Sequence, residues 1–211
     1  MTQLIGLGGL KESGKDQVAN HLVATRGWAK IGMSDVLAQG LLTINPAIPD
    51  PHKYFPAQFS PEEHWVPYNE FLIRVGSYEA AKRHRDVRIL LLNMGTKFGR
   101  NMVDENMWVA MTERAILPLL ASGQSVAVTG IRFHNELNMV LRNGGATYWV
   151  ERPLITQRHL DAVAAGDHTA TDVSEVTLTR VDFQLQLLND LEGDLVNGLY
   201  REVDLVIQAG V

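Results

Sequence analysis

The chain contains no cysteine among its 211 residues. This absence excludes disulfide bonds, thiolate zinc sites and cysteine nucleophiles, and it fits a reducing compartment. No apolar run approaches the length of a membrane-spanning helix, so we expect no membrane partner. Positive charge is not in excess, since the net charge is −5 and the pI is near 5.8, which argues against nucleic acid as a partner. The first apolar run starts too early to leave room for a signal peptide, and we expect a cytoplasmic protein.

Proline is scarce outside one segment, because six of the eight prolines fall between Asn45 and Pro67. Aromatic residues, among them Trp65, are interleaved with these prolines, and Tyr68 follows directly. Proline lacks the amide donor that helices and central strands need, so we expect no regular structure over 45–67. A long insertion in a compact domain is usually functional or mobile. The plain alternative is a poorly ordered surface loop.

The most informative feature is the run from Gly9 to Asp16, which has the form G-x-x-x-x-G-K of a phosphate-binding loop. An apolar run at 3–8 predicts a strand before it, and helical spacing over 14–25 predicts a helix after it. In such a loop the backbone N–H groups and the positive end of the helix dipole face an anion. Lys15 adds a mobile cation for the β- and γ-phosphates. Asp16 stands where Ser or Thr is usual.

Hydrophobic periodicity organises the rest of the chain into one α/β domain with an insertion, and 45% hydrophobic content suffices for its core. Further strands are predicted at 27–33, 125–129, 146–150 and 181–187. Helices are predicted at 36–42, 68–75, 77–92, 104–120, 135–142 and 191–207. Residues 203–208 could instead form a strand, and 153–173 has no clear assignment. The alternation of strands and helices predicts a parallel sheet with helices on both faces and a ligand at the carboxyl ends of its strands.

Several segments together resemble the phage-type deoxynucleoside monophosphate kinases, a branch of the P-loop nucleoside monophosphate kinases. The matching pieces, spread over nearly the whole chain, are Lys11–Asp16, Ser34–Leu37, Asn93–Arg100, Asn106–Val109, Ile131–Glu136, Glu151–Pro153, His168, Ser174-Glu175 and Asn189-Asp190. The resemblance implies a P-loop NTPase-like three-layer α/β/α fold with a five-stranded parallel sheet of order 2-3-1-4-5. It also implies a single kinase domain over 1–211, a substrate-binding insertion at 44–100 and a lid-like segment at 152–174.

The same resemblance implies transfer of a phosphoryl group from ATP, with Mg²⁺, to a deoxynucleoside 5′-monophosphate, in the host cytoplasm if the protein is phage-encoded. The partners are then small nucleotides, and a homodimer is left open. The residues expected to hold the ATP phosphates are Gly9, Lys11, Glu12, Ser13, Gly14, Lys15 and Asp16. For Asp16 we expect a magnesium ligand, direct or through water. The alternatives are a base for the acceptor phosphate and an acidic first-turn residue favoured by the helix dipole.

Arginine is the residue type best suited to grip phosphate, because its planar fork donates two hydrogen bonds. Arg100 resembles the family's arginine for the acceptor phosphate, and Arg132 follows a strand whose end should meet the substrate. The competing interpretations are a surface position for Arg100 and an ion pair with Glu136 for Arg132. Arg152 and Arg158 flank the start of the lid-like segment and would stabilise the transferred charge on closure.

Base recognition is the least defined part of the sequence. Asp35, Trp65 and Tyr68 are candidates for hydrogen bonding to or stacking on the acceptor base, whereas Trp108 is better explained as core. Glu175 belongs to a His…Ser-Glu pattern that matches the family but suggests no definite chemistry.

One departure from the family pattern concerns the metal. Gly130 stands where the family usually has an aspartate that orients Mg²⁺ or its waters, which leaves Asp16 as the acidic group near the metal. Three alternatives to a deoxynucleoside monophosphate kinase stay open: a kinase for another phosphorylated metabolite of phosphomevalonate type, a P-loop ATPase or switch without an acceptor, and a binding module that has lost catalysis.

Overall fold

The computed structural model describes residues 2–49, 65–167, 170–171, 173–190 and 194–208. The chain divides into two compact units. The first comprises Met1–Met33 and Val109–Val211, and the second comprises Ser34–Trp108. Within the described ranges, no helix is both long enough and apolar enough to cross a membrane.

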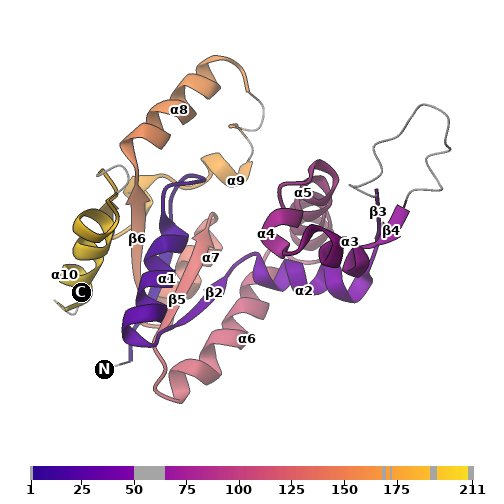
Figure 1. The fold of residues 1–211 in the computed structure, drawn as a ribbon. Coiled ribbons are helices and arrows are strands. Elements are labelled where there is room, and N and C mark those ends of the chain that lie inside the picture. The colour runs from indigo at the N-terminus through magenta and orange to yellow at the C-terminus, as the bar shows by residue number, and fades with distance from the viewer. Residues whose placement is uncertain (1, 50–64, 168–169, 172, 191–193, 209–211) are drawn as a thin grey trace. The chain divides into compact units, whose positions relative to one another are not determined.

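The first unit is built on a five-stranded sheet whose neighbouring strands all run parallel (Figure 1). Its strands are β1 (Leu4–Gly8), β2 (Ala29–Gly32), β5 (Val126–Ile131), β6 (Ala146–Glu151) and β7 (Leu185–Leu188). They lie in the order β2-β5-β1-β6-β7, which is 2-3-1-4-5 when these five are numbered along the chain. The expected fold class and strand order are therefore confirmed.

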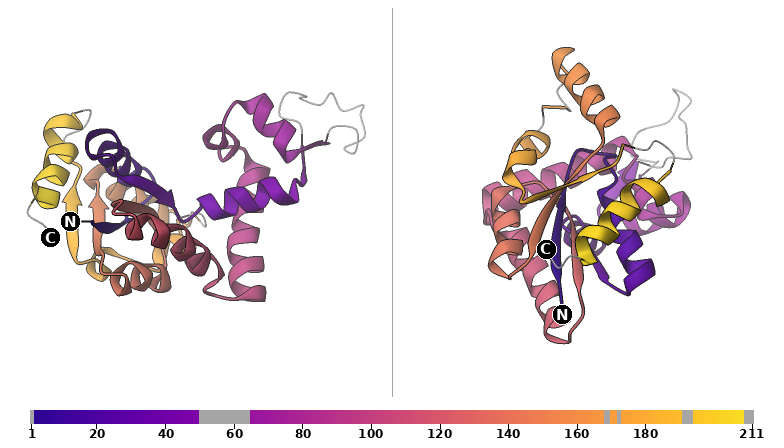
Figure 2. Two further views of the ribbon diagram at one scale, coloured as in Figure 1. Left: turned by 90° about the horizontal axis from the view of Figure 1, so that it is seen from below. Right: turned by 90° about the vertical axis from the view of Figure 1, so that its left-hand side faces the viewer.

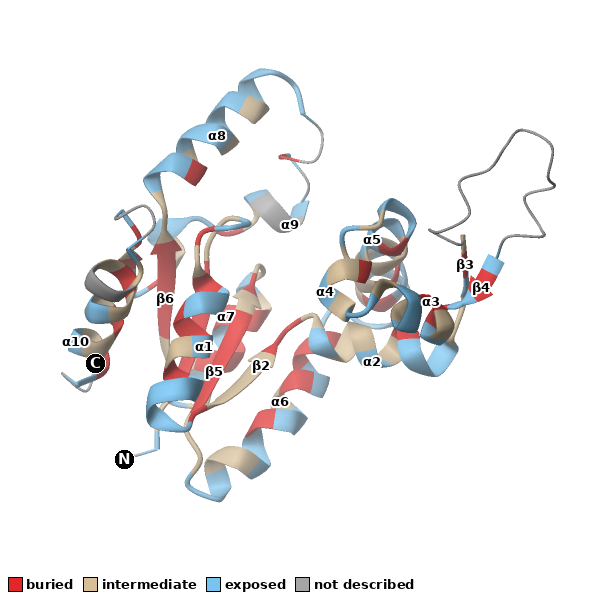
Figure 3. Ribbon diagram, viewed as in Figure 1, coloured by how far each residue is buried: buried red, intermediate tan, exposed pale blue. Residues whose placement is uncertain are grey.

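Helices cover both faces of this sheet and create two separate cores (Figure 2). One core joins β1, β5 and β6 to helices α6 (Met107–Ala121) and α7 (His134–Arg142). The other joins β1, β5, β6 and β7 to α1 (Lys15–Arg26) and α10 (Arg201–Gln208). The central strands are buried along nearly their whole length, as Figure 3 shows for β5 and β6. This two-sided burial explains why their sequences are continuous apolar runs.

The second unit consists mainly of helices around its own apolar core. Its elements are α2 (Asp35–Ile44), β3 (Ala47–Pro49), β4 (Trp65–Pro67), α3 (Tyr68–Val75), α4 (Tyr78–Ala81), α5 (Arg85–Leu92) and a wide helix of π type, η2 (Asn93–Val103). The i→i+5 geometry of η2 is visible at its end, where the Asp104 amide donates to the Gly99 carbonyl at 2.9 Å.

Several expectations need correction. Residues 47–49 and 65–67 form a short antiparallel pair, whereas irregular structure was expected throughout 45–67, of which 50–64 lie outside the described residues. The helix expected at 77–92 is two helices, because it breaks at residues 82–84. Arg100 and the residues before it lie in η2. The last strand is β7 alone, preceded by a 3₁₀ turn at Arg180–Asp182, and residues 203–208 are helical rather than a strand.

Candidate active site

The loop over 9–16, which is expected to bind phosphate, connects β1 to α1 at the carboxyl end of the central strand. Two of its glycines need a backbone conformation that other residues avoid, with φ of 139° at Gly9 and 109° at Gly14. They also need to lack a side chain. A Cβ on Gly9 would lie 2.6 Å from the Val150 carbonyl oxygen, and one on Gly14 would lie 2.8 Å from Nδ2 of Asn189. The loop is therefore held tightly in one shape.

Donors from three parts of the chain hold the carbonyl oxygens of this loop. Lys15 Nζ donates to the Leu10 carbonyl at 3.1 Å, and Arg152 Nη1 donates to the Glu12 carbonyl at 3.3 Å. The side-chain amide of Asn189 donates to the Ser13 carbonyl at 2.9 Å. Lys15 and Arg152, both expected at the site, therefore contact neighbouring carbonyl groups of the loop.

The loop has the features that an anion requires. Helix α1 begins at Lys15 after Gly14, which supplies no side-chain cap, and the first N–H groups of a helix lack partners within it. The hydroxyl of Ser13 is buried without a hydrogen-bond partner among the described residues. Lys15 is buried next to it. These donors fit the phosphates of a nucleotide.

Asp16, in the first turn of α1, is paired with a lysine that the sequence analysis did not single out. Lys30 Nζ, from β2, lies 3.0 Å from Oδ1 of Asp16. Partial burial raises the pKa of Asp16, but Lys30, Lys15 and the Thr129 hydroxyl outweigh it, and the pKa lies below its usual value. Asp16 is therefore ionised at neutral pH, which is the form in which a carboxyl group binds Mg²⁺.

No cluster of three histidine, aspartate or glutamate side chains suited to a metal occurs in the part of the chain that the structure describes. Such a cage is not what Mg²⁺ usually requires, because it is held by one or two carboxylates together with substrate phosphates and water. Asp16 beside the phosphate-binding loop fits this mode.

Gly130 occupies a bulge at the end of β5. The register of β1 against β5 runs from the pair Leu7–Thr129 to the pair Gly8–Ile131, so Gly130 is the extra residue. Its φ is 79°, in the left-handed region. No atom lies within 4 Å of the position that a Cβ would take. Space would admit an aspartate here, but the backbone disfavours any residue other than glycine.

Arg132 follows β5, and its main-chain amide donates to Oε2 of Glu136 at 2.7 Å. The same carboxylate accepts from the Phe133 amide at 3.3 Å, so the buried Glu136 caps the start of α7. The backbone amide of Arg132 thus contacts the carboxylate that was expected as its ion-pair partner.

The segment 152–174, expected to form a lid, contains α8 (Pro153–Ala164) and the start of the short α9 (Val173–Val176). Arg152 immediately precedes α8 and reaches the loop, whereas Arg158 is exposed on α8. Glu175 lies in α9, and its side chain is outside the described part, as is His168 altogether.

In the second unit, four polar groups interact near the start of α2, those of Ser34, Asp35, Tyr68 and Tyr78. Tyr68, at the start of α3, is fully buried, and its hydroxyl and that of Tyr78 have no hydrogen-bond partner within the described ranges. Burial raises the pKa of Tyr78 above its usual value, and Tyr68 and Asp35 raise it further. The nearby Ser34 hydroxyl lowers the pKa of Tyr78, although the two hydroxyls form no hydrogen bond of ordinary geometry. Sequence reasoning selected Asp35 and Tyr68 but missed Tyr78.

The remaining candidates of this unit lie elsewhere on it. Trp65 in β4 is 49% exposed. Arg100 Nη1 donates to the Glu105 carbonyl at 3.1 Å. Trp108 is buried, and its Nε1 donates to the Gly95 carbonyl at 2.8 Å, which agrees with a core role.

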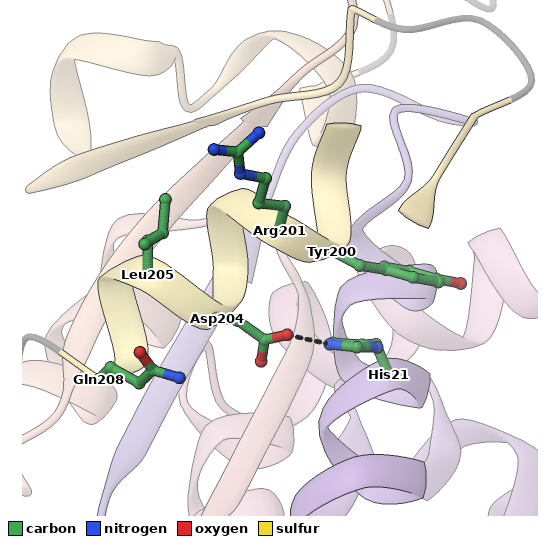
Figure 4. A pocket seen from close by; sticks show the side chains of 6 residues that line it. All are labelled: His21, Tyr200, Arg201, Asp204, Leu205 and Gln208. Carbon is green, nitrogen blue, oxygen red and sulfur yellow. Dashed lines mark hydrogen bonds and ion pairs between the residues drawn. The ribbon is translucent and has the colours of Figure 1, made fainter. Parts of the chain in front are cut away.

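A pocket of about 470 Å³ lies on the first unit, at the flank of α1 (Figure 4). His21 Nε2 lies 3.1 Å from Oδ2 of Asp204, and the His21 ring stacks on Tyr200 at 4.3 Å between centroids. Arg26 Nη2 contacts the other Asp204 oxygen at 2.9 Å. The pocket is lined by His21, Tyr200, Arg201, Asp204, Leu205 and Gln208, and none of these was expected at the active site.

Known proteins resemble this chain in structure rather than in sequence. No protein family model matches the chain, and no curated protein does. Among solved structures, dephospho-CoA kinase from Campylobacter jejuni is 15% identical with a TM-score of 0.47, over 99% of this chain and 96% of that one. Shikimate kinase from Bacteroides thetaiotaomicron is 11% identical with a TM-score of 0.46, over 98% and 97%. The Mycobacterium tuberculosis APS kinase in complex with AMPPNP and APS is 14% identical with a TM-score of 0.46, over 98% and 96%.

Two site residues escaped the sequence analysis because their partners are distant along the chain. Nothing in the local sequence distinguishes Lys30 from other lysines. Its contact with Asp16 depends on the position of β2 in the folded sheet. Asn189 was noted after the last strand without a role, and it contacts a residue 176 positions away. Its place at the carboxyl end of a strand was the one available signal.

Proposed function

We propose that this chain is a kinase that transfers the γ-phosphoryl group of ATP to a deoxynucleoside 5′-monophosphate, with Mg²⁺, and so supplies diphosphates for DNA synthesis. The observation that carries the proposal is the loop between Gly9 and Asp16, with Lys15 and Arg152 both donating to its backbone. A loop of this kind binds phosphate, and a second cation beside it suits charge that spreads during phosphoryl transfer.

In this scheme an oxygen of the acceptor phosphate attacks the γ-phosphorus, the bond to the β–γ bridging oxygen breaks, and ADP leaves. The acceptor phosphate is already ionised near neutral pH, so no strong base is needed. The backbone amides of the loop and Lys15 hold the donor phosphates. Asp16 is the carboxylate for Mg²⁺, which supplies further neutralisation of charge when bound. Arg132 and Arg152 stabilise the transferred group.

The acceptor is assigned to the insertion at 44–100, and the lid to 152–174. Arg100 is the proposed grip for the acceptor phosphate, and Asp35, Trp65 and Tyr68 are proposed to contact its base or sugar. Glu175 is retained as an acceptor contact on the family pattern alone. The choice of a deoxynucleoside monophosphate rests on the sequence resemblance, and the polar groups gathered at Asp35 support a hydrogen-bonded acceptor.

A coupled ADP-release assay with ATP and Mg²⁺ against each common dNMP and NMP tests the proposal. We expect turnover with one or a few dNMPs, and no more than slow hydrolysis without an acceptor. Turnover with another phosphorylated metabolite alone would replace the acceptor. Steady acceptor-independent hydrolysis would indicate an ATPase or switch, and ATP binding without any turnover would indicate a binding module.

A further inference from the structure

Asn189, which has no part in the proposed machinery, contacts the phosphate-binding loop. Its side chain is buried, and Nδ2 donates to the Ser13 carbonyl at 2.9 Å. The contact is close enough that a Cβ on Gly14 would lie 2.8 Å from the same nitrogen. Glycine at position 14 is therefore required by this approach as well as by its positive φ.

This hydrogen bond orients the whole peptide unit between Ser13 and Gly14, not only the Ser13 carbonyl. The peptide unit that joins Ser13 to Gly14 is planar and trans, as the chain has no cis peptide bond in its described part. The carbonyl of Ser13 and the amide of Gly14 therefore point in opposite directions. Because Asn189 holds the carbonyl on its own side, the Gly14 N–H points away from it. A loop binds anions only when its N–H groups, and not its carbonyls, face the ligand.

Asn189 is itself held firmly by the sheet and the C-terminal helix. Its main-chain amide donates to the Glu151 carbonyl at 2.7 Å, which ties it to the end of β6. The amide of the preceding residue, Leu188, donates to Oε2 of Glu202 in α10 at 2.5 Å. The side-chain amide of Asn189 thus anchors the loop to the edge strand of the sheet.

We infer that Asn189 is a positioning residue that orients the Ser13–Gly14 peptide and so keeps the loop ready for a nucleotide phosphate. The effect on nucleotide affinity rests on the proposed function, but the ordering of the loop does not. Without the amide, the glycine-rich loop can rotate this peptide and present a carbonyl to the anion, which lowers affinity.

The first experiment measures hydrogen–deuterium exchange of residues 9–16 without nucleotide, in the wild-type chain, Asn189→Leu and Thr147→Val. Leucine has a similar size but donates no hydrogen bond. Thr147 is a matched control, because it is also buried in the same unit and its hydroxyl accepts from the Gln184 amide at 3.2 Å, away from the loop. We expect faster exchange across 9–16 in Asn189→Leu alone. Equal exchange in Asn189→Leu and the wild type would overturn the inference.

The second experiment measures the affinity for MgATP of the same proteins, after circular dichroism has confirmed that they fold. We expect Asn189→Leu to bind about tenfold more weakly, a factor that corresponds to about 1.4 kcal/mol. A wild type that fails to bind MgATP would refute the proposed function, while the exchange experiment would still decide the role of Asn189.

A conservative variant provides a pH-dependent signature, which the loss of the side-chain amide in Asn189→Leu does not produce. In Asn189→Asp the carboxylate accepts but does not donate, so at pH 7.5 it repels the Ser13 carbonyl. Burial raises the pKa of such a carboxyl, and its protonated form can donate again. The affinity of Asn189→Asp relative to wild type should therefore recover between pH 7.5 and pH 5, whereas that of Asn189→Leu should not. A constant ratio for both variants would count against the hydrogen bond.

Discussion

The ammonium group of Lys30 lies 3.0 Å from a carboxylate oxygen of Asp16. This pair links the residue proposed to bind Mg²⁺ to the edge strand β2. Asp16 is the carboxylate proposed for Mg²⁺, and Lys30 both keeps it ionised and occupies one of its oxygens. Lysine and metal are thus competitors for one group, which makes the magnesium requirement sensitive to both residues.

Replacing Asp16 by asparagine should raise the Mg²⁺ concentration for half-maximal turnover by about tenfold, because a neutral amide is a weaker ligand. Lys30→Gln should lower that concentration, since it removes the competing cation. For each variant, this concentration is measured by recording turnover as a function of Mg²⁺ at a fixed ATP concentration. Asp204→Asn, which changes a distant carboxylate of the same unit, should leave the midpoint unchanged. An unaltered midpoint in Asp16→Asn would remove this residue from the metal site.

The two arginines of the lid-like segment should differ in their effect on catalysis. Arg152 contacts the loop through the Glu12 carbonyl, whereas Arg158 is exposed on α8. We expect Arg152→Ala to lower kcat by about 100-fold, the scale of losing one donor to developing charge. Arg158→Ala should change kcat by much less. Steady-state kinetics of the two variants test this difference. A lower kcat for Arg158→Ala than for Arg152→Ala would assign the catalytic role to Arg158 instead.

Tyr68 and Tyr78 carry buried hydroxyls without partners among the described residues, and such groups usually lower stability. Tyr68→Phe should therefore leave the thermal unfolding midpoint unchanged or raise it. If the hydroxyl binds the acceptor, the KM for the acceptor should rise by about tenfold while the KM for ATP stays constant. A lower midpoint with an unchanged acceptor KM would instead show that the hydroxyl is structural.

The contacts of Asp204 predict an acid-dependent loss of stability. Partial burial raises its pKa, but hydrogen bonds from Arg26 and His21 outweigh this and leave the pKa below its usual value of 3.8. A depressed native pKa stabilises the fold above the unfolded pKa, and this contribution disappears as pH falls through the native value. The unfolding midpoint of the wild type should exceed that of Asp204→Asn at pH 7, and the difference should vanish as the pH falls below the native pKa. A difference that is constant with pH would contradict this assignment.

Gly130 should be needed for its backbone conformation rather than for lack of space. Its φ is 79°, and a side chain would meet nothing within 4 Å. Gly130→Ala should lower the free energy of unfolding by about 1 kcal/mol, equivalent to about 2–4 °C in a protein of this size. Gly130→Asn should lose less, because asparagine tolerates this region better. Calorimetry of the two variants would contradict the account if alanine were as stable as glycine.

Features that depend on neighbouring residues could be predicted before the fold was known. The spacing of Gly9, Gly14 and Lys15 defines the loop, because its amides lie within one short segment. Continuous apolar runs located β1, β5 and β6, since strands buried on both faces need no alternation. Resemblance to a known family supplied the strand order, which the structure confirms.

Features that join distant segments required the folded chain. Lys30 in β2 meets Asp16 in α1, and Asn189 after β7 meets Ser13 before α1, because the fold brings these distant segments together. The pairing of β3 with β4 escaped prediction, since each strand has only three residues and gains its hydrogen bonds from the other. Tyr78 lies within the helix expected at 77–92, and only the folded chain brings it near Tyr68 and Asp35. Local pattern fixes backbone shape, whereas contacts between distant side chains depend on how the folded elements align.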